Sequence, residues 1–184
     1  MLLVESFDIK GPLLIRPKKI GDHRGYFLES YNARSFAEAG IDATFVQDNQ
    51  SLSVQKGTIR GLHFQTPPTP QAKLVRVLKG SIFDVAVDLR AGSPTYGKWC
   101  GTNLTADGAE QLFVPRGFAH GFCTLEANTE VAYKVDNFYA PACDAGLRWN
   151  DPDINVAWPV SEAILSEKDG KLPFLAGFTT PFSI

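Results

Sequence analysis

Long apolar runs, clustered positive charge and a leader-like amino terminus are all missing from this 184-residue chain. A helix needs about 20 apolar residues to cross a bilayer, and no run approaches that length, so we expect no membrane association. The formal net charge of −2 excludes a broad basic face for nucleic acid, while leaving room for a local anion site. The first residues, MLLVESFDIKGP, hold two acids and no basic start, which argues against a signal peptide and favours a cytoplasmic protein.

Cysteine is also scarce. The three cysteines, Cys100, Cys123 and Cys143, show no spacing typical of a metal site. Their odd number argues against a framework of disulfides. We therefore expect buried thiols that stay reduced, as in a protein of the cytosol.

Helical periodicity is rare, whereas short strand-like segments recur between turns that contain Gly, Pro, Asn or Asp. This spacing is typical of an all-β sandwich or barrel. In SIFDVAVDL, Phe83 and Val85 share one face while Asp84 and Asp88 share the other, which predicts a half-buried strand with its polar side toward solvent or a cavity. Strands are expected over residues 45–54, 57–64, 72–78, 81–89, 98–104, 110–115, 120–126 and 130–139.

Two short helices are expected beside these strands. The stretch NARSFAEAG has a cap at Asn32 and a stop at Gly40, and LSEKDGKLP favours another turn near the carboxyl terminus. No repeat and no linker interrupts the sequence, so we expect residues 1–184 to form a single domain. Short antiparallel strands in this number must close up to protect their edges. The sequence therefore predicts an all-β, cupin-like double-stranded β-helix, or jelly roll, with a few short peripheral helices.

Histidine on the strands of a jelly roll raises the question of a metal site, which needs about three His or carboxylate ligands. The stretch VPRGFAHGF resembles the second motif of the metal-binding cupins, with Pro115, Gly117 and His120 in matching places. The first cupin motif needs two histidines one residue apart, but Gly61 stands where a partner of His63 would be. We therefore expect neither a metal nor another cofactor.

An organic acid and base set is the alternative to a metal. A histidine has a reference pKa of about 6.5, so His63 can accept a proton at neutral pH, although a satisfied core histidine would fit as well. Arg60 and Lys73 lie on flanking strand segments, where a cation is costly unless an anion binds to it. In a regular strand Arg60 and His63 would face opposite ways. Gly61 between them allows a bulge that could turn both to one side.

Two more residues have both a structural and a chemical interpretation. Tyr133 shares a strand face with Val131 and Val135, so it is either a core aromatic or a phenol that transfers a proton. Asp169 follows Ser166 at capping-box spacing, so it either supports a short helix or hydrogen-bonds the ring of a histidine. Sequence spacing leaves both alternatives open.

Together these residues resemble the dTDP-4-dehydrorhamnose 3,5-epimerase family. The resemblance runs in order from about residue 21 to residue 169, which is most of the chain, and the combination is far more specific than any single motif. The matching blocks are GDHRGYFLESYN, FVQDNQS, GTIRGLHFQ, AKLVRVLKGSIFDVAVDLR, GSPTYGKW, QLFVPRGFAHGF, YKVDNFYAP, WNDPDINVAWP and LSEKD.

This resemblance implies a metal-free, homodimeric jelly roll that inverts carbons 3 and 5 of dTDP-4-dehydro-6-deoxy-D-glucose in dTDP-L-rhamnose biosynthesis. It implies that His63 removes the proton and that Asp169 orients His63. Tyr133 would return a proton to the opposite face of the sugar. Lys73 would lie beside the carbonyl oxygen on carbon 4.

The resemblance also implies a set of substrate-binding residues. Tyr139 would stack on thymine, and Phe27 and Glu29 would come from the second subunit. Asp144 stands near the nucleotide where the family usually has Glu, and Gln50 and the proline-rich TPPTPQA loop also depart from the family pattern. The residues expected to hold the nucleotide diphosphate and sugar, or to lie close by, are Arg24, Gln47, Asp48, Asn49, Arg60, Lys73, His120 and Lys168.

Other functions remain open at this point. An epimerase that acts on carbon 3 alone, or a keto-sugar isomerase, would keep the same base and acid. A binding module without catalysis would be expected to lack His63 or Tyr133, and both are present. A metal-dependent oxygenase is disfavoured by Gly61.

Overall fold

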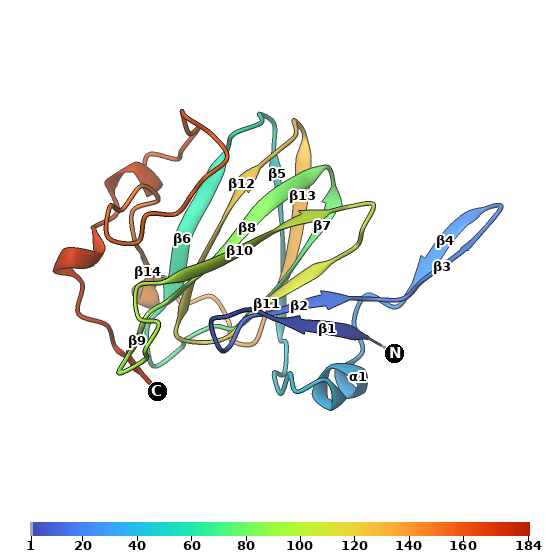
Figure 1. The fold of residues 1–184 in the computed structure, drawn as a ribbon, viewed down its shortest axis with the longest axis horizontal. Coiled ribbons are helices and arrows are strands. Elements are labelled where there is room, and N and C mark those ends of the chain that lie inside the picture. The colour runs from blue at the N-terminus through green and yellow to red at the C-terminus, as the bar shows by residue number, and fades with distance from the viewer. Residues whose placement is uncertain (1) are drawn as a thin grey trace.

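Two antiparallel sheets pack face to face in the computed structural model, which describes residues 2–184 (Figure 1). The first sheet has the strand order β1 (Leu3–Ser6), β2 (Leu13–Arg16), β11 (Gln111–Val114), β7 (Lys73–Lys79), β13 (Thr129–Val135) and β5 (Gln47–Ser53). The second has the order β10 (Trp99–Thr105), β8 (Ser81–Asp88), β12 (Phe118–Thr124), β6 (Ile59–Gln65) and β14 (Asp144–Gly146). The predicted all-β jelly roll is confirmed.

Apolar side chains from both sheets fill the space between them. Val75 and Val77 on β7 pack with Ile82 and Ala86 on β8 and with Phe122 on β12, and all five are buried. Val75 and Val77 are two positions apart on β7, and Ile82 and Ala86 are four positions apart on β8, so each pair shares one face of its strand. Burial of this apolar surface, at about 25 cal/mol per Å², is the main force that holds the sheets together.

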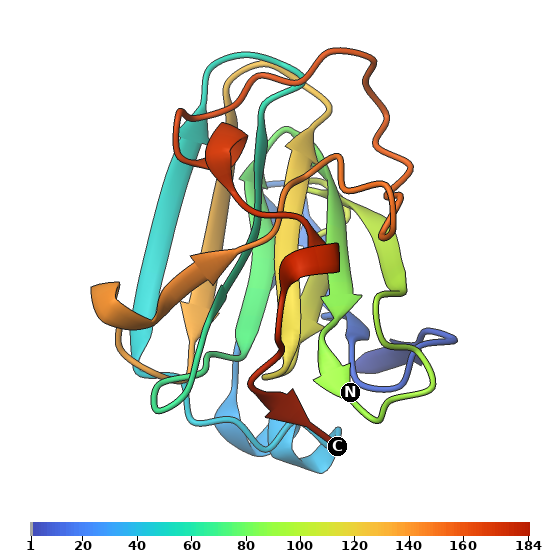
Figure 2. The same ribbon diagram turned by 90° about the vertical axis from the view of Figure 1, so that its left-hand side faces the viewer.

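The outer faces of the two sheets are covered differently. The carboxyl-terminal segment lies over the five-stranded sheet (Figure 2), where Leu147, Ile154 and Phe182 pack on Leu62 and Val85. On the six-stranded sheet, the helix α1 (Ala33–Glu38) covers part of the outer face. The side chain of its Phe36 packs with residues such as Ile15 and Leu74, and the rest of that face is left open.

The short helices follow the predicted local signals. The side chain of Asn32 accepts hydrogen bonds from the backbone N–H groups of Arg34 and Ser35 at the start of α1, and Gly40 follows with a φ of +84°. The predicted carboxyl-terminal turn is a 3₁₀-helix, η2 (Asp169–Lys171). The other 3₁₀-helices are η1 (Pro141–Cys143) and η3 (Leu175–Gly177).

All the predicted strands are present, but several short ones were missed. The predicted segments correspond to β5, β6, β7, β8, β10, β11, β12 and β13. The missed strands are β1, β2, β14 and two small pairs. One pair is the parallel β9 (Arg90–Ala91) and β15 (Phe182–Ser183). The other is the hairpin of β3 (Lys19–Asp22) and β4 (Gly25–Leu28), which projects away from both sheets (Figure 1). This hairpin is mostly exposed on both faces, so its sequence has no buried alternation to reveal it.

Two sequence-based expectations are met only in part. The polar side of β8 was expected to face solvent or a cavity, and solvent is excluded, because Asp84 and Asp88 are both 0% exposed on the face that also carries Ala86 of the core. The strand is therefore buried on both faces rather than half-buried. The opposite side, with Phe83 and Val85, packs under the carboxyl-terminal segment. Burial of the thiols is confirmed for two cysteines, whereas Cys143 on η1 is partly exposed.

Candidate active site

A bulge at Gly61 brings Arg60 and His63 into the same cavity. His63 lies opposite His120, but Arg60 lies opposite Phe122, so β6 takes one more residue than β12 over this interval. Gly61 has a φ of +141°, and a Cβ there would lie 2.5 Å from the Cα of Gly121, so only glycine fits. Arg60 and His63 both line a cavity of about 410 Å³ between the two sheets. The bulge that Gly61 allows is therefore present.

His63 is held by a buried carboxylate. Its Nε2 lies 2.7 Å from Oδ1 of Asp169, a side chain that is 5% exposed. A carboxylate only accepts hydrogen bonds, so Nε2 carries the hydrogen and Nδ1 is the ring nitrogen that can take a proton. Burial acts to raise the pKa of Asp169, but the hydrogen bond and charge of His63 outweigh it and hold that pKa below its usual value.

Both interpretations of Asp169 are realised together. Its backbone N–H donates to Oγ of Ser166 at 3.0 Å, which is the helix-capping contact. Its side chain accepts from His63 and, at 3.5 Å, from the backbone N–H of Gly61. The turn that begins η2 therefore fixes the carboxylate against the histidine.

Lys73 and Tyr133 form the wall opposite His63. Lys73 is 9% exposed, and its Nζ donates to the backbone carbonyl of His63 at 3.3 Å. Burial lowers the pKa of Lys73 to about 8, while the carboxylates of Asp84 and Asp144 act to raise it. The Nζ lies 6.0 Å from the ring centre of Tyr133, whose own pKa is raised by burial. Tyr133 therefore keeps its proton at neutral pH.

Arg60 is a cation without a carboxylate partner among residues 2–184. Its Nε donates to Oγ of Ser53 at 3.1 Å, and a terminal nitrogen donates to the carbonyl of Leu52 at 3.0 Å. These neutral contacts orient the guanidinium and leave its charge uncompensated, as a site for an anionic ligand requires.

A second cavity of about 200 Å³ adjoins the first, since His63, Lys73, Tyr133 and Lys168 line both. Its other lining residues include Gln47, Asn49, Tyr139 and Asp144. Oδ2 of Asp144 accepts from the hydroxyl of Tyr139 at 3.0 Å and from Nζ of Lys168 at 2.5 Å. The hydrogen bond to Asp144 raises the pKa of Lys168, so this lysine stays charged.

The proline-rich loop helps to place Tyr139. The side-chain amide of Gln65 donates to the carbonyl of Phe138 at 3.2 Å, and the side-chain amide of Gln71 donates to the carbonyl of Asn137 at 2.8 Å. The backbone N–H of Tyr139 itself donates to Oε1 of Gln47 at 3.0 Å. Gln71 of the loop, Gln65 at the end of β6 and Gln47 on β5 thus hold the segment that carries the exposed tyrosine ring.

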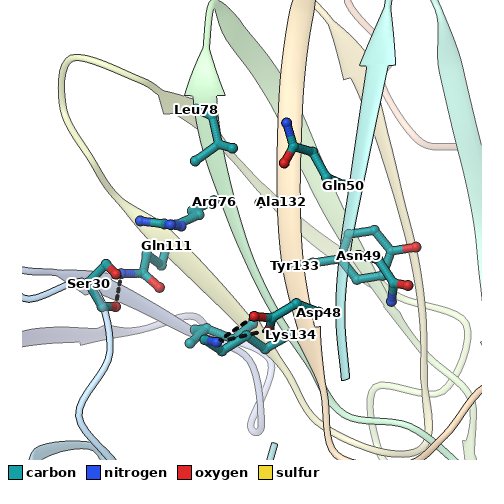
Figure 3. A pocket seen from close by; sticks show the side chains of 11 residues that line it. Ser30, Asp48, Asn49, Gln50, Arg76, Leu78, Gln111, Ala132, Tyr133 and Lys134 are labelled. Carbon is teal, nitrogen blue, oxygen red and sulfur yellow. Dashed lines mark hydrogen bonds and ion pairs between the residues drawn. The ribbon is translucent and has the colours of Figure 1, made fainter. Parts of the chain in front are cut away.

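Four of the predicted binding residues lie away from these cavities. Arg24 is in the turn of the projecting hairpin, where it pairs with Asp22, and Phe27 is 70% exposed on β4. Glu29 follows that strand and accepts from Asn32. Asp48 points to the outer face of the six-stranded sheet, where it forms an ion pair with Lys134 (Figure 3).

His120 was expected to contact the substrate, but its buried partner was not foreseen. Nε2 of His120 lies 2.7 Å from Oδ1 of Asp84, and both side chains are buried. Ser51 was also missed, although it lines the cavity. Strand alternation would have found it, because Ser51 lies two positions after Asn49 on β5.

The His, Cys, Asp and Glu side chains of the described residues are not grouped as in a metal centre. Within residues 2–184, no three or more His, Cys, Asp and Glu side chains are placed to hold a metal ion. Each cavity histidine instead has a single carboxylate partner. In the same part of the chain, no helix combines the length and the apolar character required to cross a bilayer.

Comparison with known proteins agrees with this geometry. Residues 6–177 match the family model described as dTDP-4-dehydrorhamnose 3,5-epimerase. The enzyme of that name from Sinorhizobium fredii is 50% identical over 179 residues, which cover 97% of this chain and 92% of the relative. The dTDP-4-dehydrorhamnose 3-epimerase of Streptomyces niveus is 40% identical, over 94% of this chain and 84% of the relative.

A solved structure is similar over nearly the whole length. The dTDP-6-deoxy-D-glucose-3,5-epimerase of Legionella pneumophila, in complex with dTDP-4-keto-L-rhamnose, superposes with a TM-score of 0.94 at 41% identity. The match covers 99% of this chain and 98% of that one. The sequence blocks, the two-sheet fold and these relatives agree, and this chain belongs to the dTDP-4-dehydrorhamnose 3,5-epimerase family.

Proposed function

We propose that this chain epimerises dTDP-4-dehydro-6-deoxy-D-glucose at carbons 3 and 5, which yields dTDP-4-dehydro-L-rhamnose for dTDP-L-rhamnose biosynthesis. The observation that carries the proposal is one cavity in which the His63–Asp169 pair lies beside Lys73 and Tyr133. Family membership and the ligand in the Legionella pneumophila structure support the choice of a dTDP-linked keto-sugar.

The chemistry needs a base rather than a redox cofactor. A ketone at carbon 4 acidifies the hydrogens on both neighbouring carbons, because the carbanion delocalises onto oxygen as an enolate. Nδ1 of His63 is the proposed acceptor of that proton, and Asp169 stabilises the imidazolium that forms. A positioned general base contributes about 10²–10⁴ in rate.

The enolate oxygen and the returning proton have separate partners. The ammonium of Lys73 is the proposed donor to the oxygen on carbon 4, and a preorganised donor of this kind contributes on the order of 10²–10³ in rate. Tyr133 is the proposed acid. His63 belongs to the five-stranded sheet and Tyr133 to the six-stranded sheet, so the two side chains enter the cavity from opposite walls. Inversion requires this arrangement, because the proton must return to the other face of the carbon.

The cations suit the nucleotide diphosphate. We propose that Arg60 and Lys168 bind the phosphates, with Gln47 and Asn49 nearby, and that the exposed ring of Tyr139 stacks on thymine. Asp144 neutralises Lys168 in the absence of substrate, so the phosphates must compete with this carboxylate.

We further propose a cytoplasmic, single-domain homodimer that needs no metal. An open hollow of about 300 Å³ lies on the outer face of the six-stranded sheet, around Arg76 and Gln111 (Figure 3). Leu52, Val54 and Leu78, on or just beyond the strands of that face, are 51%, 63% and 38% exposed, which favours a protein partner there. The projecting hairpin could then carry Arg24, Phe27 and Glu29 to the site of the other subunit.

Proton NMR in D₂O tests the proposed function. Metal-stripped protein is mixed with dTDP-4-dehydro-6-deoxyglucose, and deuterium is followed at each sugar carbon. Incorporation at carbons 3 and 5, with rhamnose formed once a 4-reductase and NADPH are added, is the expected result. Incorporation at carbon 3 alone would assign the activity named for the Streptomyces niveus relative, and no incorporation would leave a binding protein. Activity that returns only when a metal is added would contradict the metal-free proposal.

A further inference from the structure

Asp84 is a buried carboxylate with one oxygen left over. It lies on β8 with 0% exposure, and its Oδ1 accepts from His120 at 2.7 Å. Its Oδ2 is buried and has no hydrogen-bond partner among residues 2–184. A buried charge with an unsatisfied oxygen costs free energy of folding, so its presence calls for a reason other than stability.

The pair of Asp84 and His120 parallels the pair of Asp169 and His63. The two histidines are directly opposite each other on β12 and β6, and both line the larger cavity. Each uses Nε2 to contact a carboxylate oxygen at 2.7 Å. The carboxylates approach from different elements, Asp169 from η2 and Asp84 from β8.

The two imidazoles are suited to different work. Burial lowers the pKa of His120, although the charge and hydrogen bond of Asp84 act to raise it, so this ring stays neutral. Since Nε2 donates to Asp84, the other nitrogen, Nδ1, can only accept a hydrogen bond. A neutral acceptor in the wall of a sugar site suits a hydroxyl group and does not suit a phosphate, which itself only accepts.

Asp84 also acts on Lys73 through its charge. Several titratable or charged groups line the two cavities with Lys73 or act on it through their charge. They are Arg60 and His63 on β6, Asp84 on β8, His120 on β12, Tyr133 on β13, Tyr139 beyond β13, Asp144 on β14, and Lys168 and Asp169 at η2. Asp84 and Asp144 are the two carboxylates that favour the charged form of Lys73 against its burial. Asp144 already pairs with Lys168. Of the two carboxylates that favour the charged form of Lys73, Asp84 is therefore the one that is not already paired with another cation.

We propose that Asp84 is a positioning residue of this site, which holds His120 as a neutral acceptor for a sugar hydroxyl and keeps Lys73 cationic beside the keto oxygen. This role rests on the proposed epimerase function. It assigns His120 to the sugar rather than to the diphosphate. His120 would then bind the sugar hydroxyl next to the ketone. It lies on the same sheet as His63, the proposed base.

The first test is the pH dependence of kcat/KM for Asp84→Asn, which removes the charge and keeps the shape. Loss of the counter-charge is expected to move the alkaline limb about one pH unit lower, with about a tenfold loss of kcat/KM above that limb. Asp88→Asn is the matched control. Asp88 is equally buried on the same face of β8, but it binds Arg90, Ser93 and Thr95. It should lower stability and leave the alkaline limb in place.

The second test needs no variant. Nitrogen-15 NMR of the histidine rings in the wild-type protein reports which nitrogen of His120 carries the hydrogen. The expected result is a neutral Nε2–H tautomer from pH 6 to 8. A protonated ring, an Nδ1–H tautomer, or an Asp84→Asn profile that overlays the wild type would overturn the proposal. A failure of the proposed function itself would be visible separately, as absence of exchange in the wild-type protein.

Discussion

At the scale of single residues, the free ring nitrogen of His63 is the group on which the proposed proton transfer depends. Asp169 occupies Nε2, so Nδ1 is the only ring atom that can receive the substrate proton. His63→Ala is expected to lower deuterium incorporation at carbons 3 and 5 together by about 10²–10⁴-fold, because one base would serve both carbons. NMR exchange rates measure this. Exchange close to the wild-type rate at either carbon would assign that step to another base.

Tyr133 should separate proton removal from inversion. Tyr133→Phe keeps the ring that packs beside Lys73 and removes only the hydroxyl. Proton removal by His63 continues, so deuterium exchange with retention should persist while epimer formation falls by about 10²–10⁴-fold. Both rates can be read from the same NMR time course. An equal fall in exchange and inversion would show that Tyr133 does not supply the proton.

The lowered pKa of Lys73 predicts that activity falls at alkaline pH. Burial lowers its pKa to about 8, so the side chain is mostly a cation below that pH and mostly a neutral amine above it. The keto oxygen loses its positive partner as the pH rises, and kcat/KM should fall above pH 8. Lys73→Arg keeps the charge, because a guanidinium does not titrate in this range, so this variant should lack the limb whatever its absolute activity. If the alkaline limb of kcat/KM is unchanged in Lys73→Arg, it arises from the titration of another group.

At the scale of elements, the bulge in β6 places Arg60, the proposed phosphate ligand, and His63, the proposed base, in one cavity. Gly61→Ala places a methyl group 2.5 Å from the Cα of Gly121 in a backbone conformation that alanine avoids. We expect a loss of roughly 1–3 kcal/mol in the free energy of unfolding, and a larger loss of activity because His63 shifts. Denaturant unfolding and exchange rates measure the two effects. Gly177→Ala is the control, since nothing lies within 4 Å of its added Cβ and its φ is not positive. Equal stability and equal exchange rates in the two variants would show that the bulge does not position His63.

Sequence-based prediction succeeded within single elements and failed for contacts between elements. Alternation located the long strands, and Gly61 marked the bulge, because both signals are local. The contact between Asp169 and His63 spans 106 positions, so no spacing rule could select it over the helix cap that Asp169 also forms. Asp84 was assigned to a polar strand face, but only the packing of β12 beside β8 shows that this face is buried against His120.

At the scale of the whole molecule, the proposed substrate site takes residues from two copies of the chain. The proposed diphosphate and thymine ligands from the hairpin, Arg24 and Phe27, lie on an element that projects away from both sheets (Figure 1). The open apolar surface on the six-stranded sheet offers a place for a second copy of the chain. A hairpin that has few contacts with its own subunit is best explained as a contribution to a partner.

Complementation tests this composite site directly. One variant carries His63→Ala, and the other carries Arg24→Ala with Phe27→Ala. After unfolding and joint refolding, half of the dimers are mixed, and one of the two sites in each mixed dimer receives no substitution. About a quarter of all sites should then be intact, so activity below KM should rise well above that of either variant alone. If the hairpin served its own subunit, each site would keep one defect and mixing would restore nothing. Two copies of the His63→Ala variant refolded together provide the baseline, and sedimentation analysis confirms that the mixed species are dimers.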